Sequence, residues 1–417
     1  MVAAASDLQS RRDRALREEL IDDWGVKHAL KKIDQLTSGY GLRTRRSLLT
    51  GALRLTRGIA PGPHRSLAAC REVLGYDKPV ELYVKPDPRV QAFCTRSVAG
   101  PIMIGLSSRM LETFSDAELR FVIGHELGHA AFDHFKIPMP ATATLTDVGG
   151  KFVSRPVSLK LYLWCRAAEI TADRAGVACA GAVDPAAYAL LKIASGLGSN
   201  EIITPDLTVF TSQLDALHAA PGSCADERDE EDVLDCFDTH PYSPLRVRAL
   251  MAFGRSQAFQ RATGGNAEGI DNEELERIVE ADLAVMEPNY LEDKSDEAST
   301  LMRRVLFCAG VTVAAANGEI APTELRALRA LLGAKNVDIP DDLTGIRREL
   351  DAKLVEAKDK VSFAGRAQLL QHATIVAAAD GVVQPEELEV LIDLAARLGV
   401  DPTVIDHTLA GAAAPMD

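Results

Sequence analysis

The sequence has 417 residues and a formal net charge of −14, from 46 Lys and Arg against 60 Asp and Glu. This acidic balance, with only 5% aromatic residues, argues against nucleic-acid binding, because phosphates require a basic surface and bases stack on aromatic rings. A hydrophobic content of 47% is ordinary for a globular protein, and the length indicates two or three domains.

No membrane-spanning segment is expected from the sequence. A bilayer span requires about 20 predominantly apolar residues, and the best candidate, residues 157–168, is shorter and carries Lys160 and Arg166. The N-terminal segment lacks the apolar run of a secretory signal. The seven cysteines are scattered without close pairs, which favours reduced thiols over a disulfide framework. These features predict a soluble, cytoplasmic protein with no transmembrane segment.

The first predicted region, residues 1–75, is helical and mildly basic, with a charge pattern typical of a solvated helical face. Two short β-type segments follow, at residues 80–84 and 101–105. Pro, Asp and Gly separate them, which is the punctuation expected between strands. The sequence therefore predicts a small sheet after a helical N-terminal region.

Helices dominate the next part of the chain. Ser115 and Glu118 form the S-x-x-E pattern of a capping box, ahead of an apolar-periodic run that predicts a helix as far as His134. His134 is expected to face away from the functional side of this helix and to be structural. A second long helix is predicted over residues 156–181, and another begins at Ser243, where Ser can cap and the following Pro fits the first turn.

Residues 261–300 are polar and acidic and contain Gly and Pro, so we expect an acidic linker there. It separates a first domain, residues 76–260, from a second domain, residues 301–417. The second domain repeats itself: VAAANGEIAPTEL at 313–325 aligns with VAAADGVVQPEEL at 376–388. Such self-similarity predicts a helix–turn–helix unit used twice, and therefore an all-α domain.

The motif H-E-x-x-H, formed by His125, Glu126 and His129, lies within the first long helix. Positions i and i+4 of a helix lie on one face, so both imidazoles can bind one ion while Glu126 lies beside the open coordination position. The alternative is a pair of surface histidines on an amphipathic helix. A catalytic zinc site takes three protein ligands, and Glu169 on the second long helix is the candidate for the third. Asp173, one turn later, can hydrogen-bond the far nitrogen of a ligating histidine. We therefore expect one Zn²⁺ per chain.

In this order the motifs resemble the gluzincin family of zinc metallopeptidases that contains the CAAX prenyl endopeptidases and the HtpX heat-shock proteases. The H-E-x-x-H helix is followed by E-x-x-A-D at residues 169–173, by T-H-P at residues 239–241 and by Arg246. The resemblance covers roughly residues 75–255 and departs from the family at Gln91, where Asn is usual. It implies an α+β, mostly α-helical fold, with a zincin-type metallopeptidase domain containing a small sheet.

The resemblance also implies roles for single residues. Glu126 would be the catalytic base, and His240 would donate a hydrogen bond to the oxyanion, unless it is simply the histidine that enters the following helix. Arg246 would bind a substrate carbonyl or pair with an acidic residue. An extended substrate would add to an edge strand above the metal, through main-chain hydrogen bonds. That edge strand is expected from four residues: Ile102, Met103, Ile104 and Gly105.

The C-terminal repeat resembles the tellurite-resistance TerB-like helical domains. Their D-G-x-x-x-x-x-E turn is matched by residues 380–387 and, with Asn in the first position, by residues 317–324. Gly permits a left-handed helix end, and Pro322 or Pro385 begins the next helix, so turn formation is favoured over metal binding. An EF-hand would need a 12-residue loop with more oxygen ligands. We expect an interaction or regulatory module that binds a protein partner.

Two hypotheses follow for the whole chain. The first is a soluble zinc-dependent endopeptidase that hydrolyses polypeptides by means of a metal-activated water and is regulated by its C-terminal domain. The second is a zinc-binding scaffold with a latent site, in which the helical repeat recruits a partner. A fourth protein ligand at the zinc, for example His240, would indicate the second, because catalytic sites keep one position open.

Overall fold

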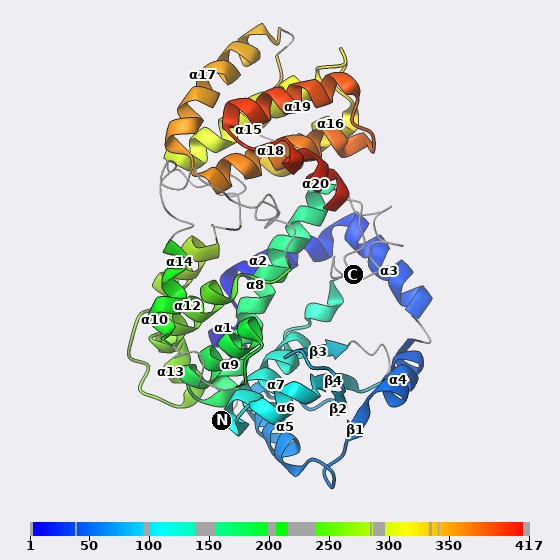
Figure 1. Ribbon diagram of the computed structural model, residues 1–417, viewed down its shortest axis with the longest axis vertical. Helices are drawn as coiled ribbons and strands as arrows, with labels where there is room; N and C mark the ends of the chain where they lie inside the picture. The colour runs from blue at the N-terminus through cyan, green and yellow to red at the C-terminus, as the bar shows by residue number, and fades with distance from the viewer. Residues whose placement is uncertain are drawn as a thin grey trace. The chain divides into compact units, whose positions relative to one another are not determined.

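The computed structural model describes residues 3–37, 40–95, 100–137, 155–198, 206–215, 239–283, 286, 297–332, 336–340 and 342–411. They belong to two compact units. The first unit consists of Met1–Met139, Trp164–Leu214 and His240–Leu283, and the second of the remaining residues. Helices dominate both units and one small sheet is present in the first, which confirms the predicted α+β, mostly α-helical class (Figure 1).

The sheet of the first unit has four strands in the order β1-β2-β4-β3. They are β1 (Leu53–Leu55), β2 (Val80–Lys85), β3 (Ala92–Thr95) and β4 (Ile102–Ser107). β2 and β4 are parallel, and the outer strands β1 and β3 pair antiparallel with them. The two predicted strands are thus β2 and β4.

β4 does not lie at the edge of the sheet. It pairs with β2 on one side and β3 on the other, so the prediction of an edge strand at residues 102–105 is wrong. Its residues are buried from Met103 to Ser107, on both faces of the strand, which is typical of an inner strand. Among the strands that the structure describes, the outer one on this side of the sheet is β3.

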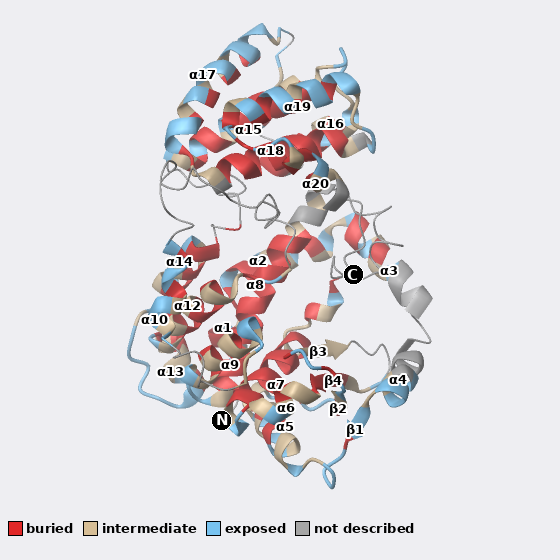
Figure 2. Ribbon diagram, in the orientation of Figure 1, coloured by how far each residue is buried: buried red, intermediate tan, exposed pale blue. Residues whose placement is uncertain are grey.

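The helices of the first unit are α1 (Ala5–Leu8), α2 (Arg11–Asp22), α3 (Trp24–Thr37), α4 (Tyr40–Gly51), α5 (Pro61–Leu74), α6 (Ser108–Thr113), α7 (Asp116–Ala131), η1 (His134–Lys136), α9 (Val183–Ser195), α10 (Leu207–Ser212), α12 (Ser243–Gly254), α13 (Gln257–Thr263) and α14 (Asn272–Leu283). The longest helix, α8 (Arg155–Ala180), has residues in both units and is buried from Leu161 to Cys179 (Figure 2). Among the described residues, no helix combines the length and apolarity needed to cross a bilayer.

The first long helix, α7, begins with the predicted capping box. Ser115 Oγ accepts a hydrogen bond from Glu118 N at 3.3 Å, and Glu118 Oε2 accepts one from Ser115 N at 2.7 Å. These bonds satisfy two of the donors that a helix start leaves unpaired. The helix ends at Ala131, and His134 belongs to the short η1 instead.

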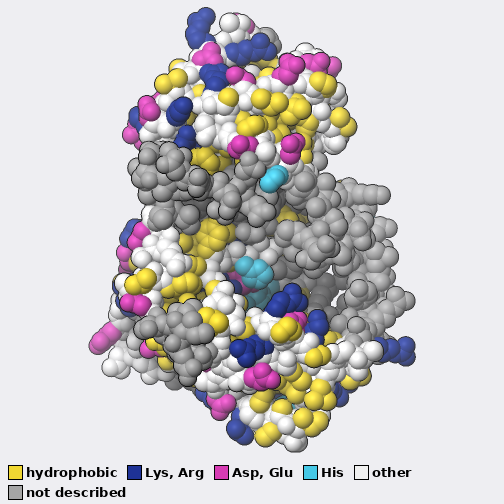
Figure 3. Space-filling view, viewed as in Figure 1, with side chains coloured by type: hydrophobic (Ala, Val, Ile, Leu, Met, Phe, Trp, Pro, Cys, Tyr) yellow, Lys and Arg dark blue, Asp and Glu magenta, His cyan; other side chains and the backbone are white. Residues whose placement is uncertain are grey.

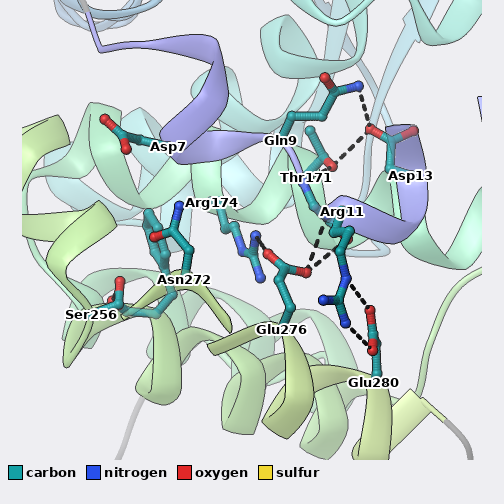
Figure 4. A network of polar contacts seen from close by, with 12 residues as sticks. Asp7, Gln9, Arg11, Asp13, Thr171, Arg174, Ser256, Asn272, Glu276 and Glu280 are labelled. Carbon is teal, nitrogen blue, oxygen red and sulfur yellow. Dashed lines mark hydrogen bonds and ion pairs between the residues drawn. The ribbon is translucent and has the colours of Figure 1, made fainter. Parts of the chain in front are cut away.

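The first unit extends beyond the domain expected over residues 76–260. Glu276 of α14 accepts a hydrogen bond from Arg174 Nη1 on α8 at 2.6 Å and another from Arg11 N of α2 at 3.2 Å (Figure 4). Three apolar side chains of α14 are buried: Leu275, Val279 and Leu283. Both the N-terminal helix and part of the expected linker are therefore packed into the same unit as the sheet.

The second unit has its own core, built from α15 (Glu297–Ala314), α16 (Pro322–Leu332), α17 (Thr344–Lys360), α18 (Phe363–Ala377), α19 (Pro385–Leu398) and α20 (Thr403–Gly411), with the short η7 (Ala378–Asp380). Gly318 and Gly381 have φ angles of 100° and 99°, in the left-handed region. α16 begins at Pro322 and α19 at Pro385, as the repeat predicts.

The glutamates of the repeated turn cap helices. Glu324 Oε2 accepts a hydrogen bond from Ala321 N at 2.7 Å, and Glu387 Oε2 accepts one from Gln384 N at 2.8 Å. Both carboxylates thus take the same place in the two halves of the repeat, which agrees with the prediction of turn formation. The side chain of Asp380 lies outside the described part of the chain.

His372 of α18 is fully buried, and burial lowers its pKa to about 3. The ordinary pKa is 6.5, so between pH 6.5 and 3 the unfolded state binds more protons than the folded state. We therefore expect the stability of the second unit to fall by up to about 1.4 kcal/mol per pH unit as the pH drops below 6.5. Hydrogen exchange of α18 amides at several pH values, corrected for intrinsic rates, measures this. His372→Phe should remove the pH dependence and His407→Gln, a control on α20, should keep it. Equal dependence in His372→Phe and the parent would contradict the expectation.

Candidate metal centre

Two histidine nitrogens and the two oxygens of one carboxylate meet where α7 lies against α8. His129 Nε2 is 3.3 Å from His125 Nε2 and 3.2 Å from Glu169 Oε1, and His125 Nε2 is 3.5 Å from Glu169 Oε2. All three residues are buried, and they form a group of His and carboxylate ligands able to hold one metal ion. Ligands about 2.0–2.1 Å from a tetrahedral zinc are about 3.3–3.4 Å apart. The observed spacing therefore fits three ligands of one such ion.

The surroundings of the Glu169 carboxylate favour its ionised form. Its Oε2 is buried and accepts no hydrogen bond from the described residues, although Arg246 Nη2 lies 3.3 Å away. A buried carboxylate oxygen without a hydrogen-bond donor is costly. Nearby positive groups, with His240 first and His125 and Arg246 next, overcome the effect of burial and hold the pKa of Glu169 well below its usual value. Glu169 is therefore ionised and able to bind a cation.

Glycines on both helices allow this close approach. A Cβ on Gly124 would lie 2.7 Å from Cys179 Cβ, and a Cβ on Gly128 would lie 2.9 Å from Ala175 Cβ. In the other direction, a Cβ on Gly176 would lie 2.7 Å from the Phe121 carbonyl oxygen. No side chain larger than hydrogen fits at these positions without a shift of the neighbouring helix. This close approach of α7 and α8 brings His125 and His129 within ligand distance of Glu169.

Asp173 contacts the ring nitrogen of His125 that does not face Glu169. Its Oδ1 accepts a hydrogen bond from His125 Nδ1 at 2.9 Å. This bond places the ring proton on Nδ1 and leaves Nε2 as the ligand nitrogen. Burial favours a protonated Asp173, but Arg246 and His125 outweigh it and lower the pKa of this carboxyl. The structure thus brings Asp173 to the position that the sequence predicts for it.

Arg246 of α12 is occupied by carboxylates. Its Nε donates to Asp173 Oδ2 at 2.8 Å and its Nη2 donates to Asp173 Oδ1 at 2.7 Å. The same Nη2 is near Glu169, and the side chain is buried. Of the two roles left open by the sequence, the geometry fits the acidic partner, which corrects the assignment of Arg246 to substrate binding. α12 begins at Ser243 itself, so this residue is the first of the helix and not its cap.

Glu126 and His240 lie close enough to His125, His129 and Glu169 to interact with them electrostatically. Glu126 is buried, and burial raises the pKa of its carboxyl even though His125 and His129 lower it. His240 is exposed over 63% of its side chain, with Nε2 3.6 Å from Glu169 Oε1. Figure 3 shows a group of histidine side chains reaching the surface on the drawn face. A carboxyl whose pKa is raised is suited to proton transfer. An accessible imidazole is suited to hydrogen-bond donation.

Comparison with known proteins agrees with this geometry. Residues 64–253 match Peptidase family M48 and residues 303–408 match the family described as Tellurite resistance protein TerB. The chain contains an M48 peptidase domain. It is 31% identical over 143 residues to the plastoglobule-localized metallopeptidase 48, chloroplastic, of Arabidopsis thaliana. This match covers 33% of the chain and 41% of the relative, so the chain spans about two fifths of the relative's length. No solved structure matches.

The edge strand of the M48 domain is β3. Ser107 N of β4 donates to Gln91 O at 3.0 Å, so the antiparallel alternation directs the main-chain groups of Phe93 and Thr95 toward β4. The main-chain groups of Ala92 and Cys94 then point to the outer edge. β3 packs against α7, the helix that carries Glu126, and burial together with the charge of Glu126 raises the pKa of the Cys94 thiol. Within the described part of the chain, the outer strand is therefore β3 and not residues 102–105, and it packs against the helix that carries the H-E-x-x-H motif.

Gln91 closes the turn before β3 where the family usually has Asn. Its Nε2 donates to Asp87 Oδ2 at 2.5 Å, and its main-chain N donates to Ser107 Oγ at 3.2 Å. The longer amide thus still holds the turn against β4.

Two residues beside the metal centre were not predicted from the sequence to lie there. His134 Nδ1 is 2.9 Å from His129 Nδ1, and His134 Nε2 is 3.2 Å from Asp13 Oδ2. The spacing of five residues after His129 is a signal that sequence can supply for His134, which was expected to face away. Asp13 precedes the matched region by about 50 residues, and no spacing or motif indicates it.

Proposed function

We propose that this chain is a zinc-dependent endopeptidase in which His125, His129 and Glu169 hold one Zn²⁺. The observation that carries the proposal is the spacing of the ligand atoms of these three residues, which fits a tetrahedral zinc site, within an M48 domain. The chemistry supplied by bound Zn²⁺ is polarisation of the scissile carbonyl and acidification of a water molecule.

Glu126 is the general base in this proposal. Its carboxylate accepts a proton from the attacking water and later delivers that proton to the leaving nitrogen. Burial raises the pKa of this carboxyl, which supports both roles, because a more basic carboxylate accepts the proton of the water more readily. His240 donates a hydrogen bond from Nε2 to the oxygen that becomes negative in the tetrahedral intermediate.

Substrate binds as an extended strand along β3. The main-chain groups of Ala92 and Cys94 provide a pairing edge, and the packing of β3 against α7 supports its position beside the helix that carries Glu126. Main-chain pairing makes little demand on side chains and requires an unpaired backbone. We therefore expect cleavage of unfolded polypeptides.

Metal analysis and a cleavage assay test the proposal together. The purified chain should contain about one Zn²⁺ and cleave casein, lose activity with a chelator, and regain it when Zn²⁺ is returned. A chain that holds zinc without cleaving any unfolded polypeptide would support the scaffold hypothesis instead. A chain without affinity for Zn²⁺ would overturn the proposal.

Regulation by the TerB domain and its binding of a protein partner stay predictions from the resemblance. Comparing cleavage rates of the full chain before and after proteolytic release of residues 303–408 would test regulation, and equal rates would count against it. Cytoplasmic location also stays a prediction, since the Arabidopsis relative is named for chloroplast plastoglobules.

A further inference from the structure

A chain of three side chains runs from the N-terminal helix to the metal centre. Asp13 on α2 contacts His134 of η1, and His134 contacts His129 on α7, through nitrogen and oxygen atoms 3.2 and 2.9 Å apart. Asp13 is 0% exposed, His134 is 1% exposed and His129 is 8% exposed, so water does not compete for these contacts. The interaction joins residues 121 positions apart in the sequence.

Asp13 is held in a fixed position by further donors. Trp164 Nε1 donates to its Oδ1 at 2.9 Å, and Thr171 Oγ1 donates to its Oδ2 at 2.9 Å. Gln9 Nε2 adds a contact to Oδ2 at 3.1 Å (Figure 4). A buried carboxylate with this many donors is rigid, and it can hold the ring of His134 in one orientation.

The positions of the ring protons follow from the contacts. His129 turns Nε2 toward His125 and Glu169, so this nitrogen must be unprotonated to bind a metal ion. A neutral His129 then carries its proton on Nδ1 and donates it to His134 Nδ1. His134 must in turn be protonated on Nε2, where it donates to Asp13. One consistent arrangement of protons therefore extends from the carboxylate to the ligand nitrogen.

We propose that Asp13 and His134 are positioning residues for the metal ligand His129, so that helix α2 completes the metal centre. The proposal rests on the metal site of the proposed function and extends it to His134 and to Asp13, of which Asp13 lies outside the M48 match. Asp173 orients His125 by direct contact, whereas Asp13 orients His129 through an intervening imidazole. Each ligating histidine thereby acquires a buried carboxylate that selects its tautomer.

Zinc affinity in the full chain, measured by competition with a chromophoric chelator, tests the proposal. Asp13→Asn and His134→Phe should each weaken Zn²⁺ binding by about 10–100-fold. His134→Gln keeps one acceptor and one donor and should recover part of this loss. Glu276→Gln is the matched control, because Glu276 is another buried carboxylate that holds α2, through Arg11 N and Ser10 Oγ, without contacting His134. Its Zn²⁺ affinity should stay within about twofold of the parent.

The outcomes separate this inference from the proposed function. A parent chain that binds no Zn²⁺ fails the proposed function, whereas a parent that binds it with variants of equal affinity overturns only the role of Asp13 and His134. An equal loss in Glu276→Gln would also overturn it, because the effect would then be a general loosening of α2.

A second measurement uses the parent protein alone, so it tests the roles of Asp13 and His134 even if the substituted chains do not fold. In zinc-loaded parent protein with ¹⁵N-labelled histidine, nuclear magnetic resonance should show His129 protonated on Nδ1 and neutral His134 protonated on Nε2. A His134 protonated on Nδ1 would overturn the proposal, since it could not accept the proton of His129.

Discussion

Replacing Glu126 with Gln is expected to lower kcat/KM for an unfolded polypeptide by at least about 10²-fold, with Zn²⁺ still bound. Gln has nearly the same shape as Glu but cannot accept a proton, so the variant removes the base and leaves the ligands His125, His129 and Glu169 in place. Glu126 is buried and burial raises the pKa of its carboxyl, so water is a weaker base at this position than the side chain that the substitution removes. The measurements are steady-state cleavage of casein and zinc content on the same preparation.

Glu118→Gln provides the control for this substitution. Glu118 is another buried carboxylate on α7, but it serves the capping box and pairs with Lys192. Its loss should reduce stability while cleavage per folded molecule stays near that of the parent. Should Glu126→Gln cleave as fast as the parent, Glu126 is not the base; should it also lose zinc, its effect belongs to the metal site.

Replacing Arg246 with Met is expected to destabilise the metal-free first unit by about 3–5 kcal/mol. Met fills the same space but leaves Asp173 and Glu169 as buried carboxylates without their shared cation. The depressed pKa values of both carboxyls mean that this stabilisation is present above their unfolded values, 3.8 and 4.5. It is lost as the pH falls through the lower folded values. The difference between variant and parent should therefore be largest near neutral pH and shrink in acid.

Hydrogen exchange of α8 amides in metal-free protein measures this difference. Arg248→Met is the matched control, because Arg248 lies two residues further along α12 and pairs with Asp282, while its side chain is more exposed, at 27%. Its loss should cost less than about 1 kcal/mol. Equal losses in the two variants would show that the buried pairing of Arg246 with Asp173 contributes no more to the free energy of unfolding than the exposed pair.

Local patterns account for what the sequence could predict. The capping box at Ser115 and the pair His125 and His129 depend only on contacts within one helix, where spacing fixes geometry. The repeated turns need Gly at a positive φ, which is also a local requirement. Glu169 could be placed because it falls in a motif of its own on a second helix.

Features that depend on distant partners could not be predicted. A strand of four residues, Ala92–Thr95, carries too little pattern to show that it pairs outside β4. Arg246 has two chemically reasonable partners, and only the packing of α12 against α8 decides between them. Asp13 is one acidic residue among several on a polar helix, and its burial arises from contacts with Trp164 and Thr171, more than 150 residues away.

The glycine contacts between α7 and α8 determine how the metal centre responds to change. Because a Cβ at Gly124, Gly128 or Gly176 would overlap atoms of the opposite helix, the two helices can lie this close only while these three positions carry no side chain. Repacking elsewhere in the core can alter rotamers without moving one ligand helix relative to the other. The spacing of the ligand residues should therefore tolerate many substitutions elsewhere in the core. It is sensitive at these few positions, where one added methyl group would separate the helices.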